Sequence, residues 1–101
     1  MPNQRIDVPM DKIAEFCRKW RVKELSLFGS VLRDDFRPDS DVDVLVACKE
    51  DAAWSLWDHL HAEEELAKIL GRNVDLVTKA AVRNPFRRHH ILRNREVIYA
   101  A

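Results

Sequence analysis

Glycine and cysteine are scarce in this sequence, net charge is absent, and each shortage narrows what the protein can be. The 101 residues include 2 glycines and 2 cysteines, and 17 basic residues balance 17 acidic ones. A neutral chain has no general attraction for nucleic acid or an anionic membrane, so we expect any polyanion to bind at a local site. Two distant cysteines, Cys17 and Cys48, favour buried free thiols in a reducing cytosol over a disulfide framework or a zinc site.

Long apolar runs are missing as well. No run approaches the roughly 20 residues that a membrane-spanning helix needs, and the first residues lack the apolar stretch of a signal peptide. These absences predict a cytoplasmic protein. The chain is 47% hydrophobic and 34% charged, which is typical of a folded globular protein. At this length we expect one domain, residues 1–101, with a modest core.

Apolar periodicity predicts alternating helices and strands. Helices are expected near residues 9–20, 51–70 and 86–93, and strands at 24–28, 42–47, 74–77 and 97–99. The alternation predicts an α+β (α/β-like) fold, with a small mixed sheet flanked by helices.

The long middle helix is expected to begin at a cap supplied by Asp51 and to stop at Gly71. Its apolar stripe would consist of Leu56, Leu60, Ala67 and Leu70. Trp54 and Trp57 are three residues apart. We expect one of them in the core and the other on a surface that faces a partner.

Two carboxylates interrupt the second expected strand. Asp41 and Asp43 are separated by one residue, so a strand would project both from the same face. Like charges this close repel each other, and burial adds a desolvation cost, unless a cation compensates. Mg²⁺ suits this role because it prefers oxygen ligands and takes one or two carboxylates together with substrate phosphates.

A third acid repeats the anomaly. Asp75 lies in the apolar run of the third expected strand. If this strand neighbours that of Asp41 and Asp43, the three carboxylates converge. They could hold two metal ions, or hold one and leave Asp75 as a base toward an attacking hydroxyl. The alternative, in which each aspartate caps a turn or pairs with an arginine at a strand end, is less favoured because the three acids and a Gly-Ser turn occur together.

The Gly-Ser turn is Gly29-Ser30, and ten residues separate Ser30 from Asp41. Glycine lets the backbone approach a ligand closely, and the N–H groups of a helix start bind phosphate. Ser30 would open a short helix and add a hydroxyl donor, and Arg33 could reach a phosphate one turn further on. By contrast, the Arg87-Arg88-His89-His90 run is expected to be a solvated basic face, with a contact to nucleic acid or an acidic partner as the less favoured alternative.

With these residues the chain resembles the nucleotidyltransferase superfamily related to DNA polymerase β, and more narrowly its minimal nucleotidyltransferase family. The matching pattern is G-S-x10-D-x-D followed by a third strand acid. The resemblance implies transfer of a nucleoside monophosphate from a nucleoside triphosphate, usually ATP, to a hydroxyl, with Mg²⁺. It implies that Gly29 and Ser30 hold the triphosphate, that Asp41 and Asp43 bind metal, and that Asp75 completes the site and helps to activate the acceptor.

The resemblance also implies a protein partner. Members of the minimal family often act with a HEPN-domain RNase toxin, as antitoxins that adenylylate a tyrosine of the toxin. The expected function is therefore Mg²⁺-dependent AMP transfer within a hetero-oligomeric toxin–antitoxin pair. The alternative is a binding module of the same fold that neutralises its partner by contact alone. Transfer to a small molecule such as an aminoglycoside generally needs an additional substrate domain, for which this length leaves no room.

Overall fold

A four-stranded mixed sheet organises the fold. The computed structural model describes residues 8–29 and 41–100. The helices are α1 (Met10–Trp20), α2 (Leu56–Leu70) and α3 (Pro85–Arg93), with a short 3-10 turn, η2, at Lys79–Ala81. The strands are β1 (Val22–Phe28), β2 (Val42–Cys48), β3 (Val74–Thr78) and β4 (Arg95–Ala100). They lie in the order β3-β2-β1-β4, which confirms the predicted fold class.

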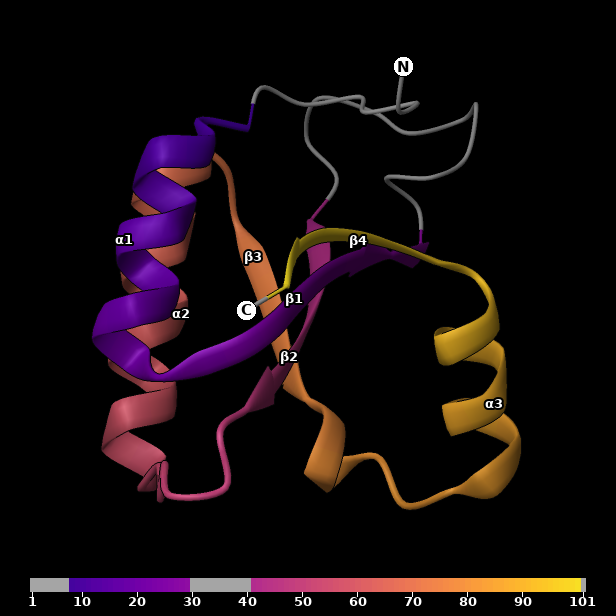
Figure 1. Ribbon diagram of the computed structural model, residues 1–101. Helices are drawn as coiled ribbons and strands as arrows, with labels where there is room; N and C mark the ends of the chain where they lie inside the picture. Colours follow the sequence, from indigo (N-terminus) through magenta and orange to yellow (C-terminus); the bar gives the residue numbers. More distant parts are fainter. Residues whose placement is uncertain (1–7, 30–40, 101) are drawn as a thin grey trace.

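Strand directions explain where the helices lie. β1 is antiparallel to both β2 and β4, whereas β2 and β3 are parallel. Parallel neighbours need a crossover connection, and α2 supplies it. Helices α1 and α2 cover one face of the sheet and α3 lies on the other side (Figure 1).

The two faces bury separate apolar clusters. The α1/α2 face holds the larger core, to which β2 contributes Val42, Val44 and Val46. A smaller cluster on the α3 face includes Leu45 of β2 with Phe28, Val82 and Ile91. Because side chains alternate along a strand, the odd-numbered positions of β2 and β3 face α3. The sheet therefore turns both strand aspartates away from the main core.

Most element ends agree with the sequence predictions. In α1, Ile13, Phe16 and Cys17 are buried, as the apolar face predicts. Asn84 caps α3, because its side-chain oxygen accepts hydrogen bonds from the N–H groups of Phe86, at 3.0 Å, and Arg87, at 3.1 Å. No helix among the described residues is long and apolar enough to cross a membrane.

The start of α2 corrects a prediction. Asp51 does not cap the helix; it forms an exposed ion pair with Arg21, the cap residue that follows α1. Ser55 is the cap: its hydroxyl accepts a hydrogen bond from the N–H of Asp58 at 3.1 Å, and its own N–H donates to the Asp58 carboxylate at 2.9 Å. This reciprocal capping box satisfies two backbone donors, which is why the helix begins at Leu56. Gly71 ends it with φ +68°, as predicted.

The expected apolar stripe of α2 is wrong in its first half. Leu56 is 74% exposed and Leu60 is 40% exposed. The buried residues of the helix are Ala62, Leu66 and Leu70, spaced four apart on one face. The first turn of α2 therefore shows apolar side chains to solvent.

The paired tryptophans have different surroundings. Trp54 is half-buried and packs against the larger core, where its ring meets Trp20 edge-on with centroids 5.8 Å apart. Trp57 is 69% exposed. The structure therefore assigns the core position to Trp54, and the partner-facing role of Trp57 stays a prediction.

Candidate functional site

Gly29 and Asp43 are in direct contact, although thirteen residues separate them along the chain. Phe28, the last residue of β1, pairs with Asp43 in the sheet register. Gly29 follows with φ +73°, a conformation that glycine adopts without strain. A Cβ atom at this position would lie 2.2 Å from Oδ2 of Asp43. The carboxylate therefore fills the space that a side chain at residue 29 would need, and Gly29 meets one of the strand acids, Asp43.

The parallel register brings the third acid to the same place. Asp43 of β2 pairs with Asp75 of β3. Both belong to the odd-numbered positions that face α3, and paired residues of neighbouring strands lie side by side. Asp43 is half-buried, whereas Asp75 is exposed. The strands of these two acids are therefore neighbours in the sheet, as predicted, and the register places the two residues side by side.

Asp41 lies just before β2 and is exposed. The next residue, Val42, donates its N–H to the carbonyl of Asn73 at 2.9 Å, which ties the start of β2 to the segment entering β3. Within residues 8–29 and 41–100, no group of three or more His, Cys, Asp or Glu side chains is placed to hold a metal ion. Asp41 therefore remains a predicted ligand.

Three other sequence-based expectations lie outside the described residues. They are the hydroxyl of Ser30, the reach of Arg33 toward a phosphate, and the short helix that would carry both. Their proposed roles stay predictions.

A cavity of about 610 Å³ begins at Gly29 and extends toward α3. Its lining residues are Phe28, Gly29, Arg87, His90, Ile91, Asn94 and Arg95. Three of them carry basic side chains, and the acids lie on the same face of the sheet. The cavity therefore places basic side chains beside the glycine that contacts Asp43.

Local contacts hold the polar wall of this cavity. The Asn94 amide nitrogen donates to the carbonyl of His90 at 2.9 Å, which closes the end of α3. Arg95 forms an ion pair with Glu24 of β1. Arg88 turns elsewhere, toward the carbonyls of Lys79 and Val82. Within the basic run of α3, it is therefore Arg87 and His90 that line the cavity.

The sequence interpretation missed this role of α3. It expected the basic run to be a solvated face, and the exposure of Arg87 and His90 agrees with that. The sequence did not reveal the position of the helix, because that position depends on Ile91 packing against Phe28 and Leu45 of the sheet. The useful signal was Asn84-Pro85, which fixes the start of α3 and thus which side chains turn toward the sheet.

The cavity, the paired acids and the glycine contact all lie in a part of the chain that matches a known family. Residues 10–98 match the model of the nucleotidyltransferase domain family. The chain belongs to this family. The match spans the β1–β2 turn, the βαβ unit and α3, so every part of the described site lies within the nucleotidyltransferase domain.

Relatives of this nucleotidyltransferase domain include archaeal proteins. A Methanocaldococcus jannaschii relative, provisionally named as a protein adenylyltransferase, is 41% identical over 68 residues, which are 67% of this chain and 68% of the relative. The protein adenylyltransferase MntA of Thermococcus cleftensis is 36% identical over 85 residues, which are 84% of this chain and 81% of that protein.

Solved structures share the fold at low sequence identity. A chain of a toxin–antitoxin crystal structure with AMP-PNP is similar with a TM-score of 0.74 at 19% identity, covering 93% of this chain and 75% of that one. A chain from the complex of tri-AMPylated Shewanella oneidensis HEPN toxin with its MNT antitoxin has a TM-score of 0.66 at 19% identity, covering 91% of this chain and 70% of its own length.

Proposed function

We propose that this nucleotidyltransferase domain transfers AMP from ATP to a hydroxyl of a partner protein, a tyrosine of a HEPN-domain toxin, and so acts as an antitoxin. The contact between Gly29 and the Asp43 carboxylate carries the proposal, because it brings the first residue of the predicted phosphate-binding turn against a predicted metal ligand. Asp75, beside Asp43 in the register, supports it. The name of the Thermococcus relative supports an adenylyl group as the group that is transferred. The Shewanella complex supports a HEPN-domain toxin as the class of partner.

The donor set suits Mg²⁺. Asp43 and Asp75 offer carboxylate oxygens on one face, and Mg²⁺ is commonly held by one or two carboxylates plus substrate phosphates. Asp43, Asp75 and the predicted ligand Asp41 would hold one or two ions, which would neutralise charge on the phosphates. The space kept open by Gly29 is what lets the Asp43 carboxylate stand beside the turn.

For this reaction the protein must position the triphosphate, offset its negative charge and accept the proton of the acceptor hydroxyl. The Gly29–Ser30 turn would position the triphosphate, with Arg87 and the predicted contact Arg33 meeting its negative charge. The acceptor oxygen attacks the α-phosphorus, a new P–O bond forms, and the bond to the leaving pyrophosphate breaks. Asp75, exposed at the edge of the sheet, would accept the hydroxyl proton at a carboxylate oxygen.

The experiment measures the mass of the partner. The chain is co-purified with the product of the neighbouring gene and incubated with ATP and Mg²⁺, and mass spectrometry counts the AMP groups that the partner gains. We expect wild type to add AMP and Asp43→Asn to lose transfer. Asp11→Asn, an exposed aspartate of α1 far from the site in sequence, is the matched control and should transfer normally.

The same experiment separates the competing function. A binding-only antitoxin would leave the mass of the partner unchanged, and Asp43→Asn would still neutralise the toxin in a growth assay. That pair of results would refute the enzymatic proposal. Transfer by wild type that disappears in Asp43→Asn would refute neutralisation by contact alone.

A further inference from the structure

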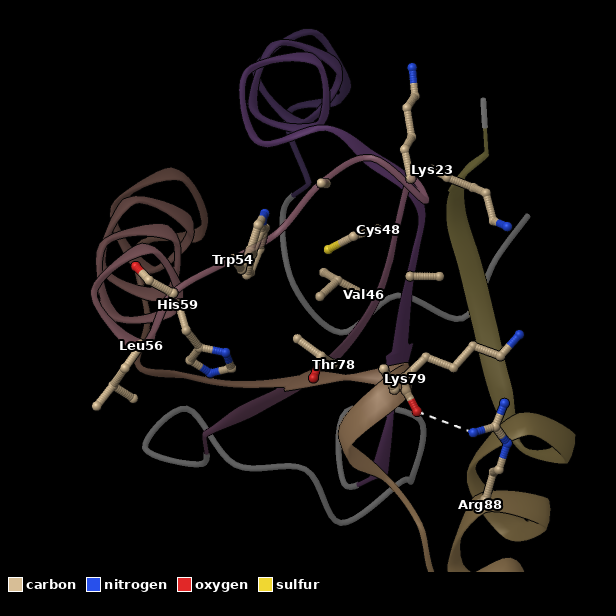
Figure 2. Close-up of a pocket in the computed structure, with 14 residues that line it drawn as sticks. Lys23, Val46, Cys48, Trp54, Leu56, His59, Thr78, Lys79 and Arg88 are labelled. Atoms are coloured by element: carbon tan, nitrogen blue, oxygen red, sulfur yellow. Dashed lines mark hydrogen bonds between the residues drawn. The ribbon is translucent and has the colours of Figure 1, made fainter.

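A second cavity lies at the opposite end of the parallel strands from the acids. It has a volume of about 670 Å³. Val46 and Cys48 at the end of β2 and Thr78 at the end of β3 form its floor, as Figure 2 shows. Asp43 and Asp75 are the second residues of the same two strands. In open sheets with parallel strands, ligands commonly bind at the carboxyl ends of the strands, which is where this cavity lies.

The lining of this cavity is cationic. Its charged members are Lys23, Lys49, Lys79 and Arg88, and His59 adds a titratable ring. None of the described residues that line it is acidic. Among the acids nearest in sequence, Glu24 pairs with Arg95, Asp51 pairs with Arg21, and Asp58 belongs to the capping box of α2. Glu50 follows Lys49 and is exposed. In a chain of zero net charge, this is a local concentration of positive charge.

The cations face an apolar and aromatic wall. Figure 2 shows Trp54 and His59 on one side of the cavity, and Lys79 and Arg88 on the other. The indole N–H of Trp54 donates to the carbonyl of Trp20 at 2.9 Å, which fixes the orientation of the ring. The volume lies in the range of small-molecule sites, which pair apolar walls with a few placed polar groups.

The cavity lacks the chemistry of a second catalytic centre. Burial raises the pKa of the Cys48 thiol, so the thiol at its floor stays neutral at physiological pH and is a poor nucleophile. Arg88 is held by the carbonyls of Lys79 and Val82 at 3.3 and 3.4 Å. These contacts set its position and leave other guanidinium donors for a ligand. The arrangement is suited to binding.

We propose that this cavity is a second binding site that takes a nucleoside phosphate, with the phosphates on Lys49, Lys79 and Arg88 and the base beside Trp54. The charge accounts for the phosphates, the aromatic wall accounts for the base, and the volume admits both. The inference does not depend on the transfer reaction at Gly29, because the two cavities share no lining residue.

Amide-resolved NMR titration of the full chain with ATP tests this site. We expect shifts at residues 46–49, 54–56 and 78–80 in addition to any near Gly29. Lys49→Gln/Lys79→Gln should raise the Kd fitted to the first set by about tenfold. Lys12→Gln/Lys68→Gln, exposed lysines on α1 and α2, should leave it unchanged. Shifts near Gly29 alone would overturn the second site, whereas shifts in the first set alone would support it and count against the proposed function.

Three further ligands identify the chemistry that is recognised. Pyrophosphate should shift the same amides as ATP but bind more weakly, since it lacks the base, and adenosine should produce no saturable shift. Adenosine binding as tightly as ATP would overturn the role of the cations. A short polyglutamate peptide that saturates the cavity where ATP does not would overturn the nucleoside phosphate in favour of an acidic protein segment.

Discussion

At the scale of single residues, the two glycines differ in what an added Cβ atom would contact. Both have positive φ, +73° at Gly29 and +68° at Gly71. A Cβ at Gly71 would meet nothing within 4 Å, whereas one at Gly29 would collide with the Asp43 carboxylate. Sequence reasoning expected Gly29 to admit a ligand. In the structure it admits a side chain of the same protein, which only the β1–β2 register could reveal.

The glycine pair gives a matched test. Gly29→Ala should displace Asp43 and reduce AMP transfer by about 100-fold, the cost typical of a misplacement of about 1 Å. Gly71→Ala should lower the free energy of unfolding by about 1 kcal/mol, because alanine is strained at positive φ. AMP transfer should be unchanged in this variant. Transfer rates and urea unfolding of both variants provide the readout. Equal transfer by the two would show that the Gly29–Asp43 contact has no part in catalysis.

The thiol of Cys17 predicts how stability depends on alkaline pH. Burial raises its pKa from 9.0 to about 12, with a smaller opposing effect from Arg18. Below pH 9 the thiol is protonated in both the folded and unfolded states, so its contribution is constant. Between pH 9 and about 12 only the unfolded chain loses the proton, which stabilises the unfolded state. Unfolding free energy should then fall by up to about 1.4 kcal/mol per pH unit from this group.

Urea unfolding across pH 9 measures this slope. Other groups titrate in the same window, so the informative quantity is the difference between wild type and Cys17→Ala. The variant will be less stable throughout because it leaves a cavity, but it should lose stability less steeply with pH. Parallel curves would mean that the thiol titrates normally in the folded chain.

At the scale of elements, the sequence predicted strands and helices well where local patterns decide them. The capping of α3 by Asn84 and the stop of α2 at Gly71 depend on neighbouring residues. The start of α2 was not predicted correctly, because both Asp51 and Ser55 are residue types that can cap a helix. The choice depended on Arg21, thirty residues away, which pairs with Asp51, and on Asp58, which completes the box with Ser55.

The two candidate caps can be compared directly. Ser55→Ala should lower the free energy of unfolding by about 1 kcal/mol, the usual cost of removing a side-chain cap. Asp51→Ala should change it by less than about 0.5 kcal/mol, because an exposed ion pair contributes little. Urea denaturation of both variants decides between them, and a larger loss in Asp51→Ala would reverse the assignment.

Helix α3 provides a test of the cavity beside Gly29. Arg87→Gln removes a cation from its wall, so the KM for ATP should rise by about tenfold, as expected for loss of a charge-assisted phosphate contact. Arg93→Gln, at the exposed end of the same helix, lies outside both cavities and should behave as wild type. Steady-state kinetics would contradict the assignment if both variants changed KM equally.

At the scale of the whole molecule, balanced composition conceals an uneven distribution of charge. The acids Asp43 and Asp75 are the second residues of the parallel strands, and the cationic cavity lies where those strands end. Counting 17 residues of each sign could not predict this, because the separation arises from the direction of β2 and β3. The acidic end is also open, since Asp41 and Asp75 are both exposed.

The open acidic end predicts that the rate of AMP transfer depends on a partner protein. A hydroxyl is activated most effectively where water is excluded, and exposed acids such as Asp75 do not exclude water unaided. The isolated chain should therefore hydrolyse ATP, or transfer AMP from it, slowly. The proposed HEPN-domain partner should raise the rate by at least about 100-fold by positioning the acceptor. Single-turnover assays with and without the partner measure this ratio, with Asp43→Asn as the background. Rapid AMP transfer from the isolated chain to free small alcohols would contradict the idea that the partner completes the acceptor side of the site.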